Sequence, residues 1–255
     1  MEAVKKTYDS LASGYHQMFG DWHASVRQQG RTLDGLLKKM GHAAGGASIL
    51  DCSCGIGTQA IGLALLGHRV HATDLSPKAV QVAKRHAREM GAKLGFGVAD
   101  FLALQKQVAG RFDVVLSCDN AIPHLLTEAA VLKAVRNMKA KLNPGGTLLL
   151  SIKDYEQVVP GWTLGAGPFT VREGKRLKVQ VQAWEWRKNA PIYRFHLFLL
   201  DQGAKGWSVK SVSSELRAWK QAELSALLRQ AGFKSVRWLA TKHSGYRQPI
   251  LTAKA

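Results

Sequence analysis

A glycine-rich turn between a short apolar strand and a helix is the first feature of the sequence that could bind a ligand. Residues 50–57 read LDCSCGIG, with Gly55 and Gly57 where the chain must turn into the helix. Glycine has no Cβ, so the backbone can approach a ligand closely, and the start of the helix offers free amides. Ala60 stands where the third glycine of a pyrophosphate-binding G-x-G-x-x-G would be, which argues against a dinucleotide.

Carboxylates follow the next two strands. Asp74 ends the second predicted strand, 17 residues after Gly57. A carboxylate in that place suits a ribose, because it accepts hydrogen bonds from two hydroxyls at once. After the third predicted strand, Asp100 and Phe101 supply a carboxylate and an aromatic face that suit an adenine edge. The spacing therefore predicts a site for a nucleoside-like ligand.

These residues must be positioned by alternating strands and helices. Nearly continuous apolar runs predict strands that alternate with amphipathic helices, and this alternation is typical of a parallel sheet covered on both faces. We expect an α/β fold with a Rossmann-like, doubly wound sheet of seven strands, mostly parallel. The predicted strands are 48–52, 69–74, one that ends at residue 100, 112–117, 147–152, 234–240 and 249–253, and the helices are 58–66, 77–90, 128–142 and 221–231.

Two further regions flank this core. After the fifth strand, residues 156–217 show a period of two, most clearly in KVQVQA, and predict an antiparallel β insert on the substrate side of the core. Before it, residues 1–46 are assigned to an N-terminal helical lid, since 7–40 has a helical pattern; a plain packing helix is the alternative. The core itself is expected over 47–255.

Composition excludes several classes of protein. The chain has 255 residues, 46% of them hydrophobic, which is typical of a folded globular protein. Three cysteines do not make a disulfide scaffold, and without a second Cys or His pair at ligand spacing we expect no metal site. No signal peptide or apolar run of membrane-spanning length is evident, so a cytoplasmic protein without a membrane partner is expected.

The charge is strongly positive, +18 overall, and from residue 152 onward there are 18 basic and 7 acidic residues. A basic face can attract nucleic acid or another polyanion. Here the charges are interspersed with apolar residues, so we favour a solvated surface over a nucleic-acid interface. An RNA-modifying role remains the alternative.

The ordered motifs make the interpretation specific. LDCSCGIG, then Asp74, VADF, FDVVLSCDN and LNPGG resemble the signatures of class I S-adenosylmethionine-dependent methyltransferases over residues 48–151. The resemblance implies that S-adenosyl-L-methionine is bound and S-adenosyl-L-homocysteine released. It places Gly55 and Gly57 against the methionine part, Asp74 on the ribose, and Asp100 and Phe101 on the adenine. Further cofactor contacts are expected from Leu75, Asp119, Tyr15, Trp22 and Arg27.

Within that superfamily, two segments resemble the glycine N-methyltransferase group and related bacterial toxoflavin-type N-methyltransferases. They are CDNAIPHL at 118–125 and SIKDY at 151–155. Where the glycine enzymes place an arginine on the substrate carboxylate, this chain has Lys153, which cannot make the bidentate fork. We therefore expect a larger, flatter acceptor than glycine, such as an amine or N-heterocycle stacked on Trp22, Tyr15 or Trp162.

The resemblance implies an in-line methyl transfer, in which the protein supplies orientation and excludes water. The residues expected at the reacting centre are His124, Asn120, Lys153 and Tyr155. His124 is a candidate base or positioning residue, and equally a hydrogen-bonded histidine at a helix start. We expect a small-molecule N-methyltransferase, monomeric or homo-oligomeric. RNA methylation, small-molecule O-methylation and a binding protein without turnover are the alternatives.

Overall fold

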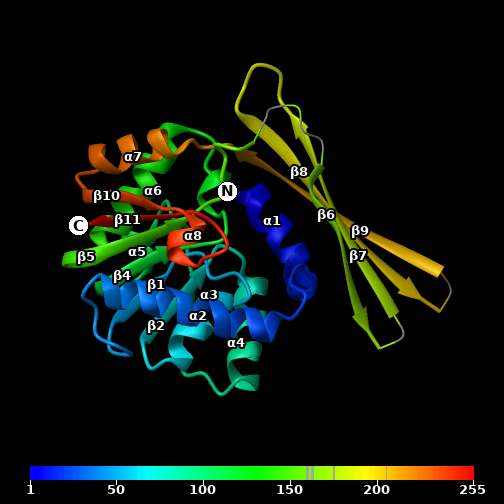
Figure 1. The fold of residues 1–255 in the computed structure, drawn as a ribbon, viewed down its shortest axis with the longest axis horizontal. Helices are drawn as coiled ribbons and strands as arrows, with labels where there is room; N and C mark the ends of the chain where they lie inside the picture. Colours follow the sequence, from blue (N-terminus) through cyan, green and yellow to red (C-terminus); the bar gives the residue numbers. More distant parts are fainter. Residues whose placement is uncertain (159–160, 162–163, 175, 205) are drawn as a thin grey trace.

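The computed structural model of the chain describes residues 1–158, 161, 164–174, 176–204 and 206–255. Figure 1 shows a layered α/β core and a long, twisted second sheet that projects from it. In the part of the chain described, no helix is long and apolar enough to cross a membrane. Trp162, expected as an acceptor-stacking residue, lies outside the described residues.

The core sheet has seven strands in the order β10-β11-β5-β4-β1-β2-β3. The pairs among β3, β2, β1, β4 and β5 are parallel, whereas β11 runs antiparallel to both of its neighbours. This confirms the predicted fold class. The strands are β1 (Ser48–Asp51), β2 (Arg69–Asp74), β3 (Gly95–Val98), β4 (Phe112–Ser117), β5 (Leu142–Ser151), β10 (Lys234–Leu239) and β11 (Ile250–Lys254).

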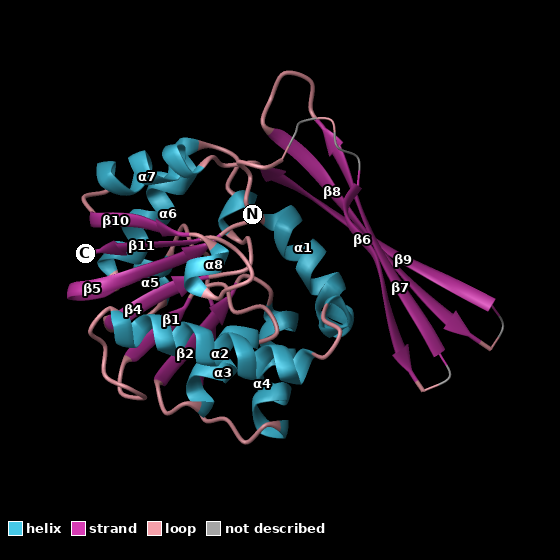
Figure 2. Ribbon diagram, in the orientation of Figure 1, coloured by secondary structure: helices cyan, strands magenta, loops and turns pink. Residues whose placement is uncertain are grey.

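Helices cover both faces of this sheet (Figure 2). Because side chains of a strand alternate between faces, Ile49 packs with the helices of one layer, and its neighbour Leu50 packs with those of the other. The helices are α2 (Trp22–Lys39), α3 (Thr58–Leu65) and α4 (Pro77–Glu89) in one layer, and α5 (Leu104–Gln107), α6 (Glu128–Ala140) and α7 (Gln221–Gln230) in the other; the short α8 (Thr241–Ser244) precedes β11.

The expected helix over 7–40 is broken. The chain forms α1 (Glu2–Leu11), a 3-10 helix η1 (Ala12–Met18) and then α2. Phe19 is extended, and Asp21 caps α2 by accepting a hydrogen bond from the Ala24 amide at 2.9 Å. A Cβ on Gly30 of α2 would come within 2.7 Å of the Gly62 backbone of α3, so the two helices pack closely. Therefore α2 belongs to the core layer, and only α1 and η1 are placed to act as a lid.

The predicted antiparallel insert forms a separate sheet in the order β6-β7-β8-β9. Its strands are β6 (Leu164–Glu173), β7 (Arg176–Trp186), β8 (Ile192–Gly203) and β9 (Gly206–Arg217). Helix α1 lies between this sheet and the core (Figure 1). It is fixed to β9 by the Thr7 hydroxyl, which donates to the Ser213 carbonyl at 2.8 Å. The fold thus brings the N-terminus and the insert to the same end of the core sheet.

Candidate active site

The turn after β1 has the backbone geometry for which glycine is required. Gly55 and Gly57 both have positive φ, 52° and 96°. A Cβ on Gly57 would lie 2.7 Å from the Ile61 side chain, so this glycine serves the turn and the packing of α3. A Cβ on Gly55 would meet nothing within 4 Å. It would project into open space, so Gly55 leaves room for a ligand.

The carboxylate of Asp74, at the end of β2, is aimed at this turn. Its two oxygens accept hydrogen bonds from the amides of Gly55 and Ser76, both at 2.8 Å. Burial raises the pKa of Asp74, and the two amides act in the opposite direction. Each carboxylate oxygen retains a second acceptor site, so the group remains able to accept two hydroxyl donors.

These residues line a first cavity, which we call the strand-end cavity because it lies over the ends of β1, β2 and β4. It holds about 690 Å³ of empty space and is partly open to solvent. Helix α1 forms one wall with Met1, Val4 and Tyr8. The remaining lining residues are Tyr15, Cys52, Ser53, Cys54, Gly55, Ile56, Thr58, Gln59, Asp74, Leu75, Phe101, Cys118, Asp119, Ala121 and His124.

A second cavity of about 630 Å³ adjoins the first on the side of the insert sheet, and we call it the insert cavity. Tyr8, Tyr15, Asp119 and His124 line both cavities and form the wall between them. The other residues of the insert cavity are Met18, Phe19, Asn120, Lys153, Gln182, Tyr193, Phe195, Leu216, Arg247 and Gln248.

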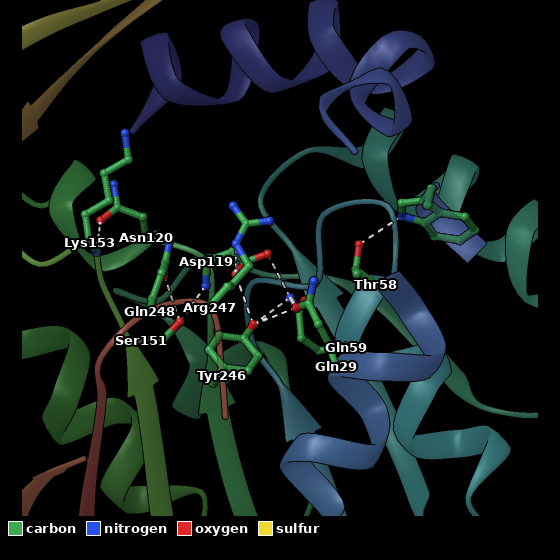
Figure 3. Close-up of polar contacts among 11 residues, drawn as sticks. Gln29, Thr58, Gln59, Asp119, Asn120, Ser151, Lys153, Tyr246, Arg247 and Gln248 are labelled. Atoms are coloured by element: carbon green, nitrogen blue, oxygen red, sulfur yellow. Dashed lines mark hydrogen bonds and ion pairs between the residues drawn. The ribbon is translucent and has the colours of Figure 1, made fainter. Parts of the chain in front are cut away.

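Asp119, in the shared wall, is held by a buried network (Figure 3). Its oxygens lie 2.9 Å from Gln59 Nε2 and 3.0 Å from the hydroxyl of Tyr246. Gln29 joins both partners, at 2.8 Å from each. Arg247 Nε lies 3.7 Å from the same carboxylate. The Asp119 side chain is therefore fixed in place between the two cavities.

His124, also in the shared wall, is buried in a one-turn 3-10 helix (Ile122–His124). Its Nε2 lies 2.8 Å from the Tyr8 hydroxyl of α1, and its Nδ1 lies 3.1 Å from the Ser214 hydroxyl of β9. Burial lowers the pKa of His124 to about 4. The ring is therefore neutral at physiological pH, and both its nitrogens already have protein partners.

Lys153, in the segment after β5, extends toward the N-terminal helix in Figure 3. Its ammonium lies 4.5 Å from the centre of the Trp184 ring. Burial, and secondarily the charge of Arg247, lower the pKa of Lys153 to about 8. With this pKa, about a tenth of the amine is uncharged at pH 7 and about half at pH 8, and this uncharged form is able to accept a proton.

Asn120 and Tyr155 support Lys153 rather than acting as a pair of reactive groups. Asn120 has a φ of 70°, and its Oδ1 accepts from the Lys153 amide at 2.9 Å. Tyr155 is buried, bonds Asn120 at 3.0 Å and Tyr193 at 2.8 Å, and lines neither cavity. Tyr155 thus reaches the cavities only through Asn120 and Tyr193, whereas Asn120 lines the insert cavity itself.

Most residues expected to contact a cofactor line the strand-end cavity, but four do not. Gly57 shapes the turn, and Asp100 uses one oxygen to accept from the Leu102 amide at 2.9 Å. Trp22 is buried, with its indole N–H donating to the Thr58 hydroxyl at 3.0 Å. Arg27 is exposed on α2. For Trp22 and Arg27 the cause is the break before α2, which places that helix in the core layer.

Sequence reasoning missed the residues that complete the two cavities. Tyr8 comes from α1, Gln182 from β7, and Arg247 and Gln248 from the loop before β11. No motif marks them, because each lies in a segment distant in sequence from the glycine turn. Among the described residues, no group of three or more His, Cys, Asp or Glu is arranged to hold a metal ion.

The sheet order, the glycine turn at the end of β1 and the carboxylate at the end of β2 define a Rossmann-like nucleoside-binding domain. Residues 49–146 match the family described as "Methyltransferase domain". The part of the chain that bears the glycine turn, Asp74 and Asp119 is thus similar to a methyltransferase domain.

Two curated relatives show how far the similarity extends. A glycine/sarcosine N-methyltransferase from Parasynechococcus marenigrum (strain WH8102) is 32% identical over 155 residues, 61% of this chain and 51% of the relative. A ubiquinone biosynthesis O-methyltransferase from Xanthomonas axonopodis pv. citri (strain 306) is 37% identical over 106 residues, 42% and 43% of the two chains. The chain thus spans about half the length of these relatives.

A solved structure extends the likeness in fold to nearly the whole chain. S-adenosylmethionine-bound CalS10, an amino pentose methyltransferase from Micromonospora echinaspora, superposes with a TM-score of 0.76 at 22% identity. The match covers 95% of this chain and 94% of that one. Both the core and the insert therefore belong to an architecture found in a methyltransferase structure.

The residues of the strand-end cavity fit S-adenosylmethionine. Gly55 leaves space that a Cβ would fill, and the Asp74 carboxylate faces the same turn with acceptor sites free. Phe101, 8% exposed, supplies an apolar side chain to the wall. The cavity thus combines a turn whose backbone a ligand can approach closely, a carboxylate that can accept hydrogen bonds from a ribose diol, and an apolar wall.

Proposed function

We propose that this protein transfers a methyl group from S-adenosylmethionine to a nitrogen of a small molecule. The observation that carries the proposal is the pair of adjoining cavities with a common wall of Tyr8, Tyr15, Asp119 and His124. One cavity fits the cofactor, and the other provides a separate, partly open place for an acceptor. Methyl transfer by in-line displacement needs this arrangement, in which the two molecules meet end to end.

In the proposed enzyme, Asp74 accepts the ribose hydroxyls, and Gly55 lets the turn after β1 approach the methionine part. Leu75 and Phe101 enclose the adenine, and Asp119 accepts a hydrogen bond from the methionine ammonium. When bound, S-adenosylmethionine supplies an electrophilic methyl carbon attached to a positively charged sulfur. Helix α1 closes over the cavity and excludes water.

The insert cavity supplies groups that suit a nitrogen acceptor. An amine must lose its proton to expose its lone pair and must lose another after methylation. Lys153, with its pKa near 8, accepts such a proton in part of the enzyme population at neutral pH. His124, neutral and held by Tyr8 and Ser214, positions the acceptor instead of serving as the main base.

Methylation of an oxygen is the second candidate, because curated O-methyltransferases align with the domain as well as an N-methyltransferase does. A phenol or alcohol would also need to lose a proton to a base. Lys153 could accept that proton with the same geometry. The aromatic side chains of the cavity, Tyr15, Phe19 and Phe195, suit a ring-bearing acceptor of either kind.

The proposal is tested by incubating the protein with methyl-labelled S-adenosylmethionine and a lysate divided into small metabolites, RNA and protein. We expect the label in the metabolite fraction, on a compound whose methyl carbon is bonded to nitrogen by NMR. A methyl carbon bonded to oxygen would favour the second candidate. Label in RNA would overturn the small-molecule proposal and assign the basic C-terminal third to docking.

A further inference from the structure

Three buried polar residues lie on one face of β7, at alternate positions. Gln180, Gln182 and Trp184 are 7%, 8% and 5% exposed, and they point to the same side of the sheet because strand residues alternate. Each carries a buried polar atom without a hydrogen-bond partner: Oε1 in the two glutamines and Nε1 in the tryptophan. Such atoms are costly in a folded protein unless water or a ligand satisfies them.

Gln182 differs from the other two because it lines the insert cavity. Gln180, two residues earlier, lines a separate cavity of about 180 Å³ with mostly apolar neighbours. Trp184 lines neither the strand-end cavity nor the insert cavity and packs against Tyr193, with ring centres 4.6 Å apart. Of the three residues, Gln182 alone combines an unpaired buried oxygen with a side chain that lines a cavity large enough for a small molecule.

The other carboxylate and amide oxygens of this cavity are already engaged by protein groups. Asp119 accepts from Gln59 and Tyr246, and Asn120 Oδ1 accepts from the Lys153 amide. Gln248 Oε1 accepts from the Ser151 hydroxyl at 3.1 Å. Among the described lining residues, Gln182 Oε1 is therefore the one such oxygen without a protein partner.

We infer that Gln182 is a specificity-determining residue, whose Oε1 accepts a hydrogen bond from an N–H or O–H of the methyl acceptor. The inference rests on the proposed function and deepens it by naming a substrate class. The acceptor is a small molecule with a hydrogen-bond donor that faces the insert sheet, in addition to the atom that is methylated. A molecule that lacks this donor leaves the glutamine oxygen buried and unpaired, and it binds more weakly for that reason.

The test uses the full chain with saturating S-adenosylhomocysteine, which occupies the strand-end cavity and confines probes to the insert cavity. The probes are matched pairs that differ by one donor: phenol and anisole, aniline and N,N-dimethylaniline, benzyl alcohol and benzyl methyl ether. Their affinities are measured by saturation-transfer NMR titration. In the wild type we expect the donor-bearing member to bind about tenfold more tightly, the scale of one hydrogen bond.

Three variants make the assignment specific. Gln182→Met keeps the length of the side chain and should abolish the preference for the donor-bearing member. Gln180→Met makes the same change on the same face of β7, outside the insert cavity, and should retain the preference. Gln182→Glu keeps an acceptor oxygen and should restore it. If Gln182→Met does not fold, Gln182→Leu replaces it in the same comparison.

The outcomes separate this inference from the proposed function. Failure of the wild type to bind S-adenosylhomocysteine in a calorimeter would overturn the proposed function itself. With that binding intact, a donor preference that survives in Gln182→Met, a preference for the methylated members, or no binding of any donor-bearing probe would overturn the role of Gln182 alone.

Discussion

The two cavities are built in different ways. The strand-end cavity is formed mainly by the ends of three adjacent parallel strands and by the turns that follow them, so its key residues lie in short motifs. The insert cavity is assembled from α1, η1, the segment after β5, the insert sheet and the loop before β11. Because the two cavities share only one wall, residues of the insert cavity can change without altering how the strand-end cavity binds its ligand. This division explains how one fold can bind one cofactor and serve many acceptors.

The electrostatics of the two cavities also differ. Carboxyl groups dominate the strand-end side, where burial, and after it the nearby Asp74 and Asp119, raise the pKa of Asp51, and burial and Asp9 raise the pKa of Asp74. The insert side adds Lys153 and Arg247, and the pKa of Lys153 is lowered by burial and, to a smaller extent, by the charge of Arg247. The acidic strand-end side suits a sulfonium cation. The insert side, with an amine that can accept a proton, suits a neutral nucleophile that must lose one.

The largest effect is expected on the insert side, from Lys153→Met. If Lys153 accepts the proton of the acceptor, its loss should lower kcat by roughly 10²–10⁴-fold, the usual contribution of a general base. Affinity for S-adenosylhomocysteine, measured by calorimetry, should stay unchanged because Lys153 does not line the strand-end cavity. A variant that lost cofactor affinity in proportion to rate would contradict the separation of the two cavities.

The pH dependence gives the same proposal a second readout. Lys153 accepts a proton only when uncharged, so kcat should rise about tenfold per pH unit below pH 8 and level off above it. Arg247→Met removes a neighbouring positive charge, which raises the pKa of Lys153 and should shift the profile to higher pH. If the dependence of kcat on pH were the same in this variant as in the wild type, Lys153 would be excluded as the titrating group.

The next effect lies on the cofactor side. Asp74→Ala removes the carboxylate that we assign to the ribose, and it should weaken S-adenosylhomocysteine binding by roughly 1.5–3 kcal/mol. Asp100→Ala is the matched control, since Asp100 also follows a strand of the same sheet but does not line the cavity. We expect a smaller loss there. Equal losses in the two variants, measured by calorimetry, would show that the adenine end depends on Asp100 as the motif predicts.

These two aspartates illustrate what could be predicted from the sequence. The order of strands and helices, the turn at Gly55 and the position of Asp74 follow from local patterns, and the structure confirms the fold. Position in a motif or a helix predicts cofactor contacts for Asp100 and Trp22, but one Asp100 oxygen accepts from the Leu102 amide and the Trp22 indole donates to Thr58. Motifs place the backbone well; they do not specify where each side chain is directed.

Part of the insert cavity could not be predicted for a different reason. Tyr8 and Gln182 look like ordinary residues of an amphipathic helix and an alternating strand, and they gain a role only because α1 is packed between the insert and the core. Arg247 and Gln248 lie in a short loop without a recognisable pattern. Their proximity arises from contacts between segments far apart in sequence, which periodicity and spacing do not report.

A smaller effect tests the buried carboxyl groups of the strand-end side. Burial, with Asp74 and Asp119 nearby, raises the pKa of Asp51 to about 8, while Oδ2 lacks a partner. Between about pH 4 and pH 8, the unfolded chain releases this proton and the folded chain keeps it, so the free energy of unfolding falls as pH rises. Asp51→Asn removes the titration. The stability of the variant relative to wild type should therefore increase with pH, by up to about 1.4 kcal/mol per pH unit.

Denaturant unfolding at pH 5, 6, 7 and 8 measures this difference. Asp113→Asn serves as the control, because its carboxyl group is stabilised by Ser48 and Asn143 and its pKa is lowered. Its proton is already released in the folded protein over this range, so the stability difference between that variant and wild type should not vary with pH. A difference for Asp51→Asn that stayed constant from pH 5 to 8 would mean that Asp51 is ionised in the folded protein.

The smallest effect is expected at the wall that both cavities share. Tyr8→Phe removes the hydroxyl that lies 2.8 Å from His124 Nε2 and leaves the ring in place. Loss of one neutral hydrogen bond costs about 0.5–1.5 kcal/mol, so kcat/KM for the acceptor should fall by up to about tenfold. Because α1 stays fixed to β9 by Thr7, the lid should still close, and affinity for S-adenosylhomocysteine should change by less than twofold. If the variant instead lost affinity for S-adenosylhomocysteine while its kinetics with the acceptor were unchanged, Tyr8 would contact the cofactor alone. The wall between the two cavities would then consist of Tyr15, Asp119 and His124 without Tyr8.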